Sequence, residues 1–555
     1  MEPAPPTPTE GGQTQGFRLA PWLGIALIAL AASVTSLGNG FAYDDIHAIL
    51  RNERVHSLAA PWEFFTHTYW PPGKYVGGFT LYRPVTTIGF ALQWVLGEGG
   101  PHLFHFTNVL LYVACCLLVF RLMRRLLPLQ LAWLVAALFA AHPVHVEAVG
   151  NCVGQGELWV VLFMVLAAAL FLEGREDGPL SNRSRNQIYG CYALACLAKD
   201  NGLILPGLLI FAELTVITDP RPLVRRLKAD APFWITLSMV GILYLVVRTK
   251  VTGTLAGDFP HIAIGEATAR ERLLTALRIS LEWVRLLLWP AHLQADYSPR
   301  DIERATSFGL QQAAGLTLLL GVGAITLATW KRLPVVAFGL CWTALAIFPV
   351  SNLVLKAGIL LAERTLFVPS VGAMMVLGGA TEALTRRHAR LWRPIAVAGL
   401  VLVVLGVWRS AIRQPVWKDN GTLFAQTVVD APNNYRAHWS YGLYLYEHGE
   451  KEAAFRTLQT AMTLFPYDAS LYNDVGDVYR TDGHCEQSIP LYQKALLLNP
   501  DLRYTRSRMA SCYMRLGDYG SARLELRKLV NSGYPEFEPL IQAVDSAAAA
   551  AGAFR

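Results

Sequence analysis

The stretch LWVVLFMVLAAALFL, from Leu158 to Leu172, contains no charged side chain and no proline. It forms most of a candidate span, 153–172, whose length matches the roughly 20 residues that a helix needs to cross a bilayer. Similar runs recur along most of the chain, and they predict an all-α, polytopic membrane domain with about eleven spans. The expected spans are 19–38, 105–122, 129–141, 153–172, 187–198, 203–217, 232–248, 309–329, 334–349, 366–384 and 393–411.

The composition agrees with a membrane protein. The 555 residues are 53% hydrophobic and 16% charged, whereas soluble domains carry about 25% charged residues. We interpret the net charge of +7 as a topology signal, because Lys and Arg collect on the cytoplasmic side of membrane proteins. Since no Lys/Arg block is interleaved with aromatic residues, nucleic acid is not an expected partner. The eight cysteines lack metal-binding spacing and are expected to be free thiols.

Charge also predicts the orientation of the spans. If the basic clusters are cytoplasmic, the N-terminus lies inside and the C-terminus lies outside. The stretch 274–289 contains Glu282 and Arg285, so we expect an external juxtamembrane helix there, with a further crossing as the alternative. The segments expected outside are 39–104, 142–152, 199–202, 250–308 and 350–365. Residues 1–17 are expected to be disordered, and a cleaved signal peptide is the alternative to a first membrane helix.

The C-terminal part carries a repeat. Pro432, Pro466 and Pro500 are spaced 34 residues apart, as are Gly449, Gly483 and Gly517. A 34-residue period of helix-turn-helix units is typical of the tetratricopeptide repeat, an α-solenoid. The predicted division is a membrane domain at 18–412, a linker at 413–434, repeats at 435–468, 469–502 and 503–536, and a capping helix that extends the repeat domain to 549.

Two external motifs carry candidate catalytic or binding side chains. Asp44 and Asp45 are adjacent carboxylates just outside a membrane helix, and neighbouring like charges raise one pKa, which suits a general base. A solvated loop turn is the alternative. Arg83 opens an amphipathic stretch and can hold a phosphate, although it can also be an interfacial side chain that extends to the headgroups.

Further external motifs are polar where the neighbouring chain is apolar. His145 and Glu147, which follow His142, can converge on one proton or one cation, and a divalent metal is the alternative that this spacing leaves open. Lys199 and Asp200 interrupt an apolar stretch, which indicates either a functional site or a local ion pair between the two. Asp296, Glu363 and Arg364 complete the set; Arg364 suits a phosphate, and an adjacent Glu363 would not face it on a helix.

These motifs, taken together, resemble one family. The segments are Tyr43-Asp44-Asp45, Tyr82-Arg83-Pro84, His142-Pro143-Val144-His145-Val146-Glu147-Ala148-Val149, Lys199-Asp200, Asp296-Tyr297-Ser298, Ser351-Asn352-Leu353 and Ala362-Glu363-Arg364-Thr365-Leu366-Phe367-Val368-Pro369-Ser370-Val371-Gly372. In this order they resemble the transmembrane and tetratricopeptide-repeat O-mannosyltransferases, a branch of the GT-C glycosyltransferases. The resemblance spans about 40–540.

The resemblance implies an activity and a set of roles. The donor would be a polyprenyl-phosphate sugar, mannose in the characterised branch, and the acceptor a Ser or Thr hydroxyl of a protein held by the repeat groove. Asp44 or Asp45 would deprotonate that hydroxyl, with Asp44 favoured, and single displacement would invert the anomeric carbon. Arg83, Lys199 and Arg364 would hold the lipid phosphate. The sugar or acceptor pocket would contain Tyr43, His142, His145, Glu147, Asp296 and Glu363.

Two departures from the family pattern matter. Lys199-Asp200-Asn201 stands where the family has Lys-Glu, which leaves the role of Asp200 open. The repeat array is short, which indicates a bacterial relative with its repeats in the periplasm; a eukaryotic protein would place them in the lumen of the endoplasmic reticulum. The alternatives are a non-catalytic membrane-anchored scaffold, a GT-C enzyme with a lipid or glycan acceptor, and a lipid-sugar transporter.

Overall fold

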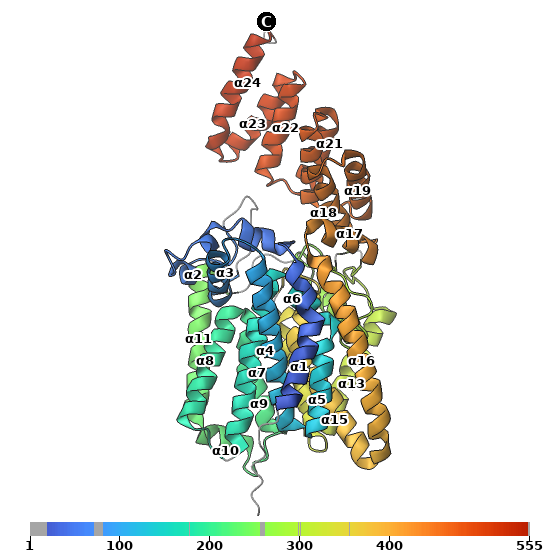
Figure 1. Ribbon diagram of the computed structural model, residues 1–555. Coiled ribbons are helices and arrows are strands. Elements are labelled where there is room, and N and C mark those ends of the chain that lie inside the picture. Colours follow the sequence, from blue (N-terminus) through green and yellow to red (C-terminus); the bar gives the residue numbers. More distant parts are fainter. Residues whose placement is uncertain are drawn as a thin grey trace, which may run out of the picture.

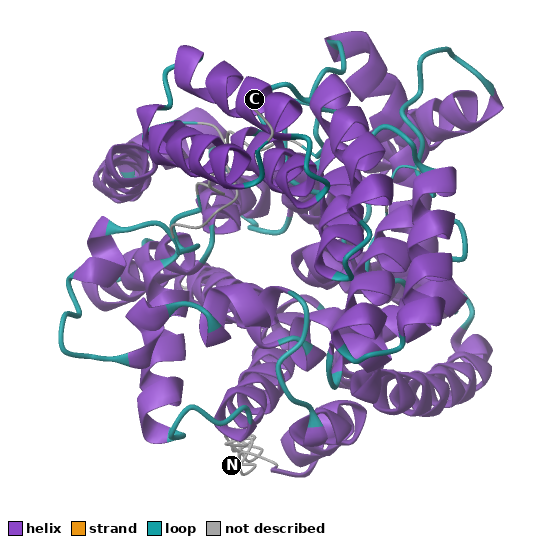
Figure 2. Ribbon diagram, turned by 90° about the horizontal axis from the view of Figure 1, so that it is seen from above, coloured by secondary structure: helices purple, strands orange, loops and turns teal. Residues whose placement is uncertain are grey.

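The structure is a computed structural model, and it describes residues 19–71, 81–176, 178–255, 261–297, 299, 301–354 and 356–552. The expected disordered segment 1–17 and Ser298 lie outside these ranges. Every regular element within them is a helix, and Figure 2 shows helices and loops throughout. The predicted all-α class is confirmed. A helical bundle forms one end of the molecule and a column of helix pairs the other (Figure 1).

Each of the eleven expected spans contains a helix. These are α1 (Leu19–Ser33), α4 (His102–Leu126), α5 (Leu129–Ala141), α7 (Gln155–Glu176), α8 (Asn182–Ala198), α9 (Leu205–Thr215), α11 (Ala231–Thr252), α13 (Leu310–Thr329), α14 (Pro334–Ile347), α15 (Phe367–Arg387) and α16 (Trp392–Arg413). In the described part of the chain, seven stretches are long and apolar enough to cross a membrane. Leu129–Ala141 and Pro143–Gly150, bent by 48°, form an eighth if counted as one span. Since α8, α9 and α14 are shorter, eleven crossings remain a prediction.

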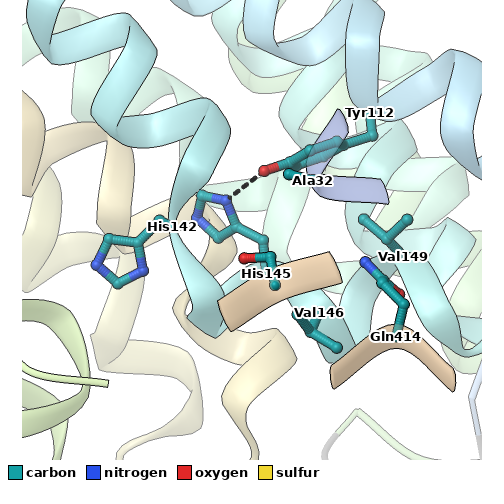
Figure 3. A pocket seen from close by; sticks show the side chains of 8 residues that line it. Ala32, Tyr112, His142, His145, Val146, Val149 and Gln414 are labelled. Carbon is teal, nitrogen blue, oxygen red and sulfur yellow. Dashed lines mark hydrogen bonds between the residues drawn. The ribbon is translucent and has the colours of Figure 1, made fainter. Parts of the chain in front are cut away.

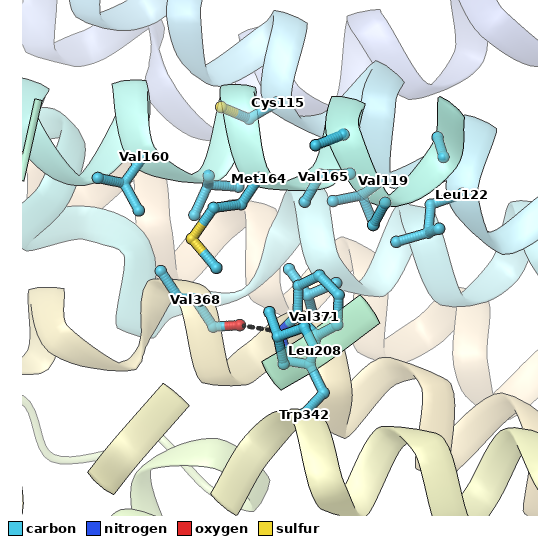
Figure 4. Close-up of a cluster of buried hydrophobic side chains, with 14 of the residues drawn as sticks. Cys115, Val119, Leu122, Val160, Met164, Val165, Leu208, Trp342, Val368 and Val371 are labelled. Carbon is cyan, nitrogen blue, oxygen red and sulfur yellow. Dashed lines mark hydrogen bonds between the residues drawn. The ribbon is translucent and has the colours of Figure 1, made fainter. Parts of the chain in front are cut away.

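The core of the bundle is apolar and closely packed. Figure 4 shows Val119 and Met164 facing Trp342, whose indole N–H donates to the carbonyl of Val368 at 2.9 Å. A Cβ on Gly339 would lie 2.6 Å from the carbonyl oxygen of Gly372, so α14 and α15 approach each other at their backbones. This contact fixes the start of α15, directly after the turn that carries Arg364. All eight cysteines are free and buried.

The two ends of the bundle carry different elements. The basic helix α10 (Leu223–Ala229) lies at the lower end in Figure 1. The upper end carries α2 (Glu63–Thr66), α3 (Pro84–Leu96) and α6 (Val146–Gly150), with the repeat helices above them. The loops predicted to be external therefore share one end with the repeats. Helix α12 (Ala269–Leu288) is not among the candidate spans, and it packs in a separate cluster with Leu293, Leu360 and Leu366.

The C-terminal part is a stack of helix pairs. Its helices are α18 (Tyr435–Glu447), α19 (Lys451–Leu464), α20 (Ala469–Thr481), α21 (Cys485–Leu498), α22 (Arg503–Arg515), α23 (Tyr519–Asn531) and α24 (Glu538–Ala550). Gly449, Gly483 and Gly517 lie at the turn inside each pair with φ of +84°, +88° and +78°, a conformation that favours glycine. This requirement explains the 34-residue spacing. Segment 413–434 contains a helix, α17 (Asn420–Asp430), instead of an extended linker.

Candidate active site

The candidate active site lies where short breaks in the helical bundle meet. The segments are the loop after α1, the start of α3, the turn that leads into α6, the break between α8 and α9, and the short helix η8 (Glu363–Leu366). Each break places its polar residue in a short helix or at the end of a longer one. Side chains that are far apart in the sequence can therefore meet at one end of the bundle.

Arg364 is the centre of the site. Its backbone N–H donates to Glu147 at 2.8 Å, and its guanidinium forms an ion pair with the same carboxylate. A second guanidinium nitrogen lies 3.3 Å from Asp44. Only 1% of the Glu147 side chain is exposed, against 25% for Asp44. Glu147 is thus the enclosed partner of Arg364, and Asp44 is the partner that solvent or a substrate can reach.

The two adjacent aspartates have different environments. Asp45 is fully buried and accepts backbone hydrogen bonds from Val153 at 2.9 Å, Ala42 at 3.2 Å and Cys152 at 3.3 Å. Burial raises the pKa of this carboxyl to about 7, against the opposing effect of these hydrogen bonds. Asp45 therefore fastens the loop to the short helix η5 (Cys152–Gly154), which precedes α7. It has no exposed oxygen to offer a substrate.

Lys199 is paired with a carboxylate, but not with Asp200, the partner that the sequence left open as an alternative. It forms an ion pair with Glu157 of α7, and the two residues are 9% and 2% exposed. Asp200 instead lies 3.1 Å from Arg248, so the local pair between Lys199 and Asp200 is wrong. The backbone explains this, because neighbouring side chains in the extended turn at Lys199 point apart.

Three cations act on one another across the site. Burial lowers the pKa of Lys199, Glu157 opposes that change, and the charges of Arg83 and Arg364 lower it further. Arg83 lies over the ring of Tyr69 at 5.0 Å, and its Nε is buried without a hydrogen-bond partner. A buried donor without a partner is costly. The arrangement therefore suits an anion that enters between these groups.

The two histidines do not join this cluster. His145 is buried, and its Nδ1 lies 3.1 Å from the Tyr112 hydroxyl (Figure 3). Its Nε2 lies 3.0 Å from the Ser370 hydroxyl. His142 Nε2 lies 3.0 Å from the carbonyl oxygen of Leu287. Because both nitrogens of His145 are engaged and Glu147 faces Arg364, this pair does not fit a metal ion. The described ranges hold no group of three His, Cys, Asp or Glu side chains placed to bind one.

Asp296 and Glu363 contact other parts of the molecule. Glu363 accepts from the Tyr297 hydroxyl at 2.9 Å and does not face its neighbour Arg364. Asp296 accepts from the Asn434 amide through its carbonyl at 2.8 Å and its carboxylate at 3.3 Å. Arg436 of α18 lies 3.9 Å from the same carboxylate. Asp296 therefore joins the membrane domain to the first repeat.

No family model matches this chain. Protein O-mannosyl-transferase TMTC4 from Mus musculus is 26% identical over 484 residues, covering 78% of this chain and 65% of that protein. Protein O-mannosyl-transferase TMTC1 from Homo sapiens is 26% identical over 511 residues, covering 84% and 58%. The chain is a relative of the TMTC protein O-mannosyl-transferases. Because the matches cover 65% and 58% of these two proteins, the chain spans less than two thirds of their length.

Among solved structures, the oligosaccharyltransferase AglB from Archaeoglobus fulgidus, in complex with an inhibitory peptide and a dolichol-phosphate, has a TM-score of 0.38 and 15% identity. The match covers 73% of this chain and 56% of AglB.

Two residues of the site escaped the sequence analysis. Glu157 lies within the expected span 153–172 and was not singled out, although a carboxylate inside an apolar span is itself a signal of function. Asn420 lies in the segment taken as a linker, and its amide oxygen accepts from the backbone N–H of Tyr43 at 2.7 Å. No local sequence pattern predicts this contact, because Tyr43 and Asn420 are far apart in the sequence.

Proposed function

We propose that this protein is a polyprenyl-phosphate-sugar-dependent glycosyltransferase that moves mannose to a Ser or Thr hydroxyl of a protein acceptor. The observation that supports it best is the cluster of Arg83, Lys199 and Arg364 beside a partly exposed carboxylate, Asp44. Cations stabilise a departing phosphate, and a carboxylate can accept the hydroxyl proton. The relatives named as protein O-mannosyl-transferases support the same reaction.

The proposed reaction is a single displacement. The acceptor oxygen bonds to the anomeric carbon while the bond from that carbon to the phosphate oxygen breaks. The electron pair of the broken bond leaves with the lipid phosphate, and the hydroxyl proton moves to Asp44. Attack opposite the leaving group inverts the anomeric carbon.

The balance of charges in the site supports proton transfer to Asp44 as the lipid phosphate leaves. Three cations, Arg83, Lys199 and Arg364, are matched by three carboxylates, Asp44, Glu147 and Glu157. When Asp44 takes the proton it becomes neutral, while the phosphate gains negative charge on release. The negative charge moves from one partner of Arg364 toward the phosphate and stays beside cations throughout. No step in this scheme needs a metal ion, and we assign none.

The proposed surroundings follow from the shape of the molecule. The cluster lies at the end of the bundle where loops and repeats gather (Figure 1), so a lipid-linked donor can reach it from the headgroup region. We propose that this end faces the periplasm in a bacterium, or the lumen of the endoplasmic reticulum in a eukaryote. The groove of the repeats, which solenoids commonly use for binding, would hold the acceptor protein.

The proposal is tested with the full chain in lipid nanodiscs, supplied with polyprenyl-phosphate mannose and Ser/Thr peptides. The expected result is a mannosylated peptide detected by mass spectrometry, together with release of polyprenyl phosphate. Transfer to glycan or lipid acceptors but not to peptides would contradict the protein acceptor. Absence of both donor binding and turnover would contradict the enzyme itself.

The donor site makes a prediction with a matched pair of variants. Lys199→Gln is expected to raise the Kd for polyprenyl phosphate by about tenfold or more, because a hydrogen bond to a charged group contributes roughly 1.5–3 kcal/mol. Glu157→Gln is expected to leave that Kd unchanged or lower it, since a competing carboxylate is removed. Titration of polyprenyl phosphate into nanodiscs measures both. Equal weakening in the two variants would indicate that the Lys199–Glu157 pair only maintains the fold.

A further inference from the structure

The loop that carries Asp44 is fastened along the segment that precedes the repeats. The Asn39 side-chain amide donates to the carbonyl of Gln414 at 2.9 Å, and the Gly40 N–H donates to the carbonyl of Lys418 at 2.8 Å. The Tyr43 N–H then donates to the Asn420 amide oxygen at 2.7 Å. The residue numbers of both partners increase from one contact to the next. Residues 39–43 of the loop therefore lie alongside residues 414–420, in the same chain direction.

The last of these contacts holds a strained residue. Tyr43 has a φ of +56°, the left-handed region that non-glycine residues rarely occupy. Such a conformation persists only where surrounding contacts fix it, and it is concentrated at functional sites. Here the fixing contacts are the hydrogen bond to Asn420 and the ring of Phe424, whose centroid lies 6.1 Å from that of Tyr43. Both partners belong to α17.

The strain at Tyr43 determines where Asp44 points. Asp44 is the next residue, so the backbone angles of Tyr43 set the direction of its carboxylate toward Arg364, 3.3 Å away. If Tyr43 relaxed to a negative φ, the backbone after Tyr43 would run in another direction, and the Asp44 carboxylate would no longer point toward Arg364. The hydrogen bond that the Tyr43 N–H donates to Asn420 is therefore placed to control the distance between Asp44 and Arg364 without touching the reacting atoms.

Helix α17 is in turn packed against the first repeat. A Cβ on Gly421 would lie 2.5 Å from the hydroxyl oxygen of Tyr444 in α18, so only glycine allows this close approach. Asn434, which caps α18, also binds Asp296 of the membrane domain at 2.8 Å. The first repeat, α17 and the loop with Asp44 are thus joined by direct contacts.

We propose that Asn420 is a positioning residue: through Tyr43 it holds Asp44 in the orientation that accepts the proton, and it links that orientation to the repeat domain. This inference rests on the proposed glycosyl transfer. It adds that the repeats do more than recruit the acceptor, because the helix before them sets the geometry of the base. An acceptor held by the repeats would then meet a base of fixed orientation.

The test compares Asn420→Ala with two other variants in nanodiscs. Asn420→Ala is expected to lower kcat by about 10- to 100-fold, the loss expected when a reacting group is misplaced by about 1 Å, while the Kd for polyprenyl phosphate stays within about twofold. Asn420→Asp keeps an acceptor oxygen and is expected to recover most of kcat. Asp419→Ala is the matched control: its carboxylate caps the same helix, accepting from the Thr422 N–H at 2.8 Å, but does not contact Tyr43.

Two kinetic results would overturn the inference, and a third result comes from hydrogen exchange. One is full kcat in Asn420→Ala. The other is an equal loss in Asp419→Ala, which would indicate that only the stability of α17 matters. Hydrogen exchange of the Tyr43 amide gives a readout that does not depend on turnover, and Asn420→Ala should accelerate it. If wild type shows no turnover, the proposed reaction fails, while unchanged exchange at Tyr43 in Asn420→Ala overturns the positioning role separately.

Discussion

Replacement of Asp44 by asparagine is expected to lower kcat for mannose transfer by about 10²- to 10⁴-fold, the usual contribution of a general base. Asparagine has nearly the same shape, and it can still accept a hydrogen bond from Arg364, which lies 3.3 Å from the carboxylate. What it lacks is a site for the hydroxyl proton. Since Glu147 continues to pair with Arg364, the variant should fold normally. The measurement is peptide mannosylation in nanodiscs, alongside the thermal unfolding midpoint.

Asp45→Asn is the matched control for Asp44→Asn. We expect it to change the stability of the protein and not the rate of mannose transfer. The folded-state pKa of Asp45, about 7, lies above its ordinary value of 3.8, so the folded protein binds more protons between these values. Its contribution to stability is therefore complete at low pH and is lost as the pH rises through about 7. Asp45→Asn should remove that slope and keep measurable transfer. If Asp45→Asn abolished transfer and Asp44→Asn did not, the roles of the two carboxylates would be reversed.

Much of the fold follows from local signals in the sequence. Apolar runs set the helices of the bundle, since a segment in lipid must satisfy its own backbone hydrogen bonds. The glycines at 449, 483 and 517 recur because the turn inside each helix pair needs a positive φ. The residue types of the site were also predictable, because charges beside apolar spans are costly and mark function. Arg364, Lys199 and Asp44 were found in this way.

Which partners these charges have could not be predicted. Lys199 binds Glu157, and Asp200 binds Arg248, because the extended backbone at the turn separates neighbouring side chains. His145 was expected in the sugar or acceptor pocket, with a metal as the alternative, yet its two nitrogens face the hydroxyls of Tyr112 and Ser370 from other helices. Pairings between distant segments depend on how helices pack, and a single sequence carries no local record of that. The contact of Asn420 with Tyr43 is missed for the same reason.

These pairings give the buried carboxylate Glu147 its partners without a substrate. Removing ions from water costs several kcal/mol each, and a buried charge is tolerated only when it is paired and hydrogen-bonded. Glu147 satisfies both conditions, since it binds the backbone and the guanidinium of Arg364. Asp44 adds a weaker and more exposed contact to the same guanidinium. Arg364 thus has an enclosed partner, Glu147, and a more exposed one, Asp44, which the proposed reaction would neutralise.

Removal of the enclosed partner is therefore expected to have the largest effect on stability. Glu147→Ala should lower the free energy of unfolding by about 3–5 kcal/mol, because it leaves the largely buried Arg364 with Asp44 alone. It should also reduce transfer strongly, since Arg364 would then pair with Asp44 alone and hold the carboxylate that is proposed to accept the proton. Glu147→Gln keeps the hydrogen-bond acceptor and should lose less stability. Thermal unfolding in nanodiscs and the mannosylation assay measure the two effects.

Glu173→Ala provides the control at the opposite end of the same bundle. Glu173 also pairs with arginines, Arg121 at 2.6 Å and Arg125 at 3.2 Å, but its side chain is 20% exposed and those of the arginines are 34% and 39% exposed. Because these side chains are only partly buried, loss of the carboxylate leaves no enclosed unpaired charge. This variant should therefore lose less stability than Glu147→Ala and keep transfer close to wild type. Similar losses in Glu147→Ala and Glu173→Ala would mean that solvent screens the two sites equally. In that case the enclosed pairing of Glu147 with Arg364 could not be what holds the site together.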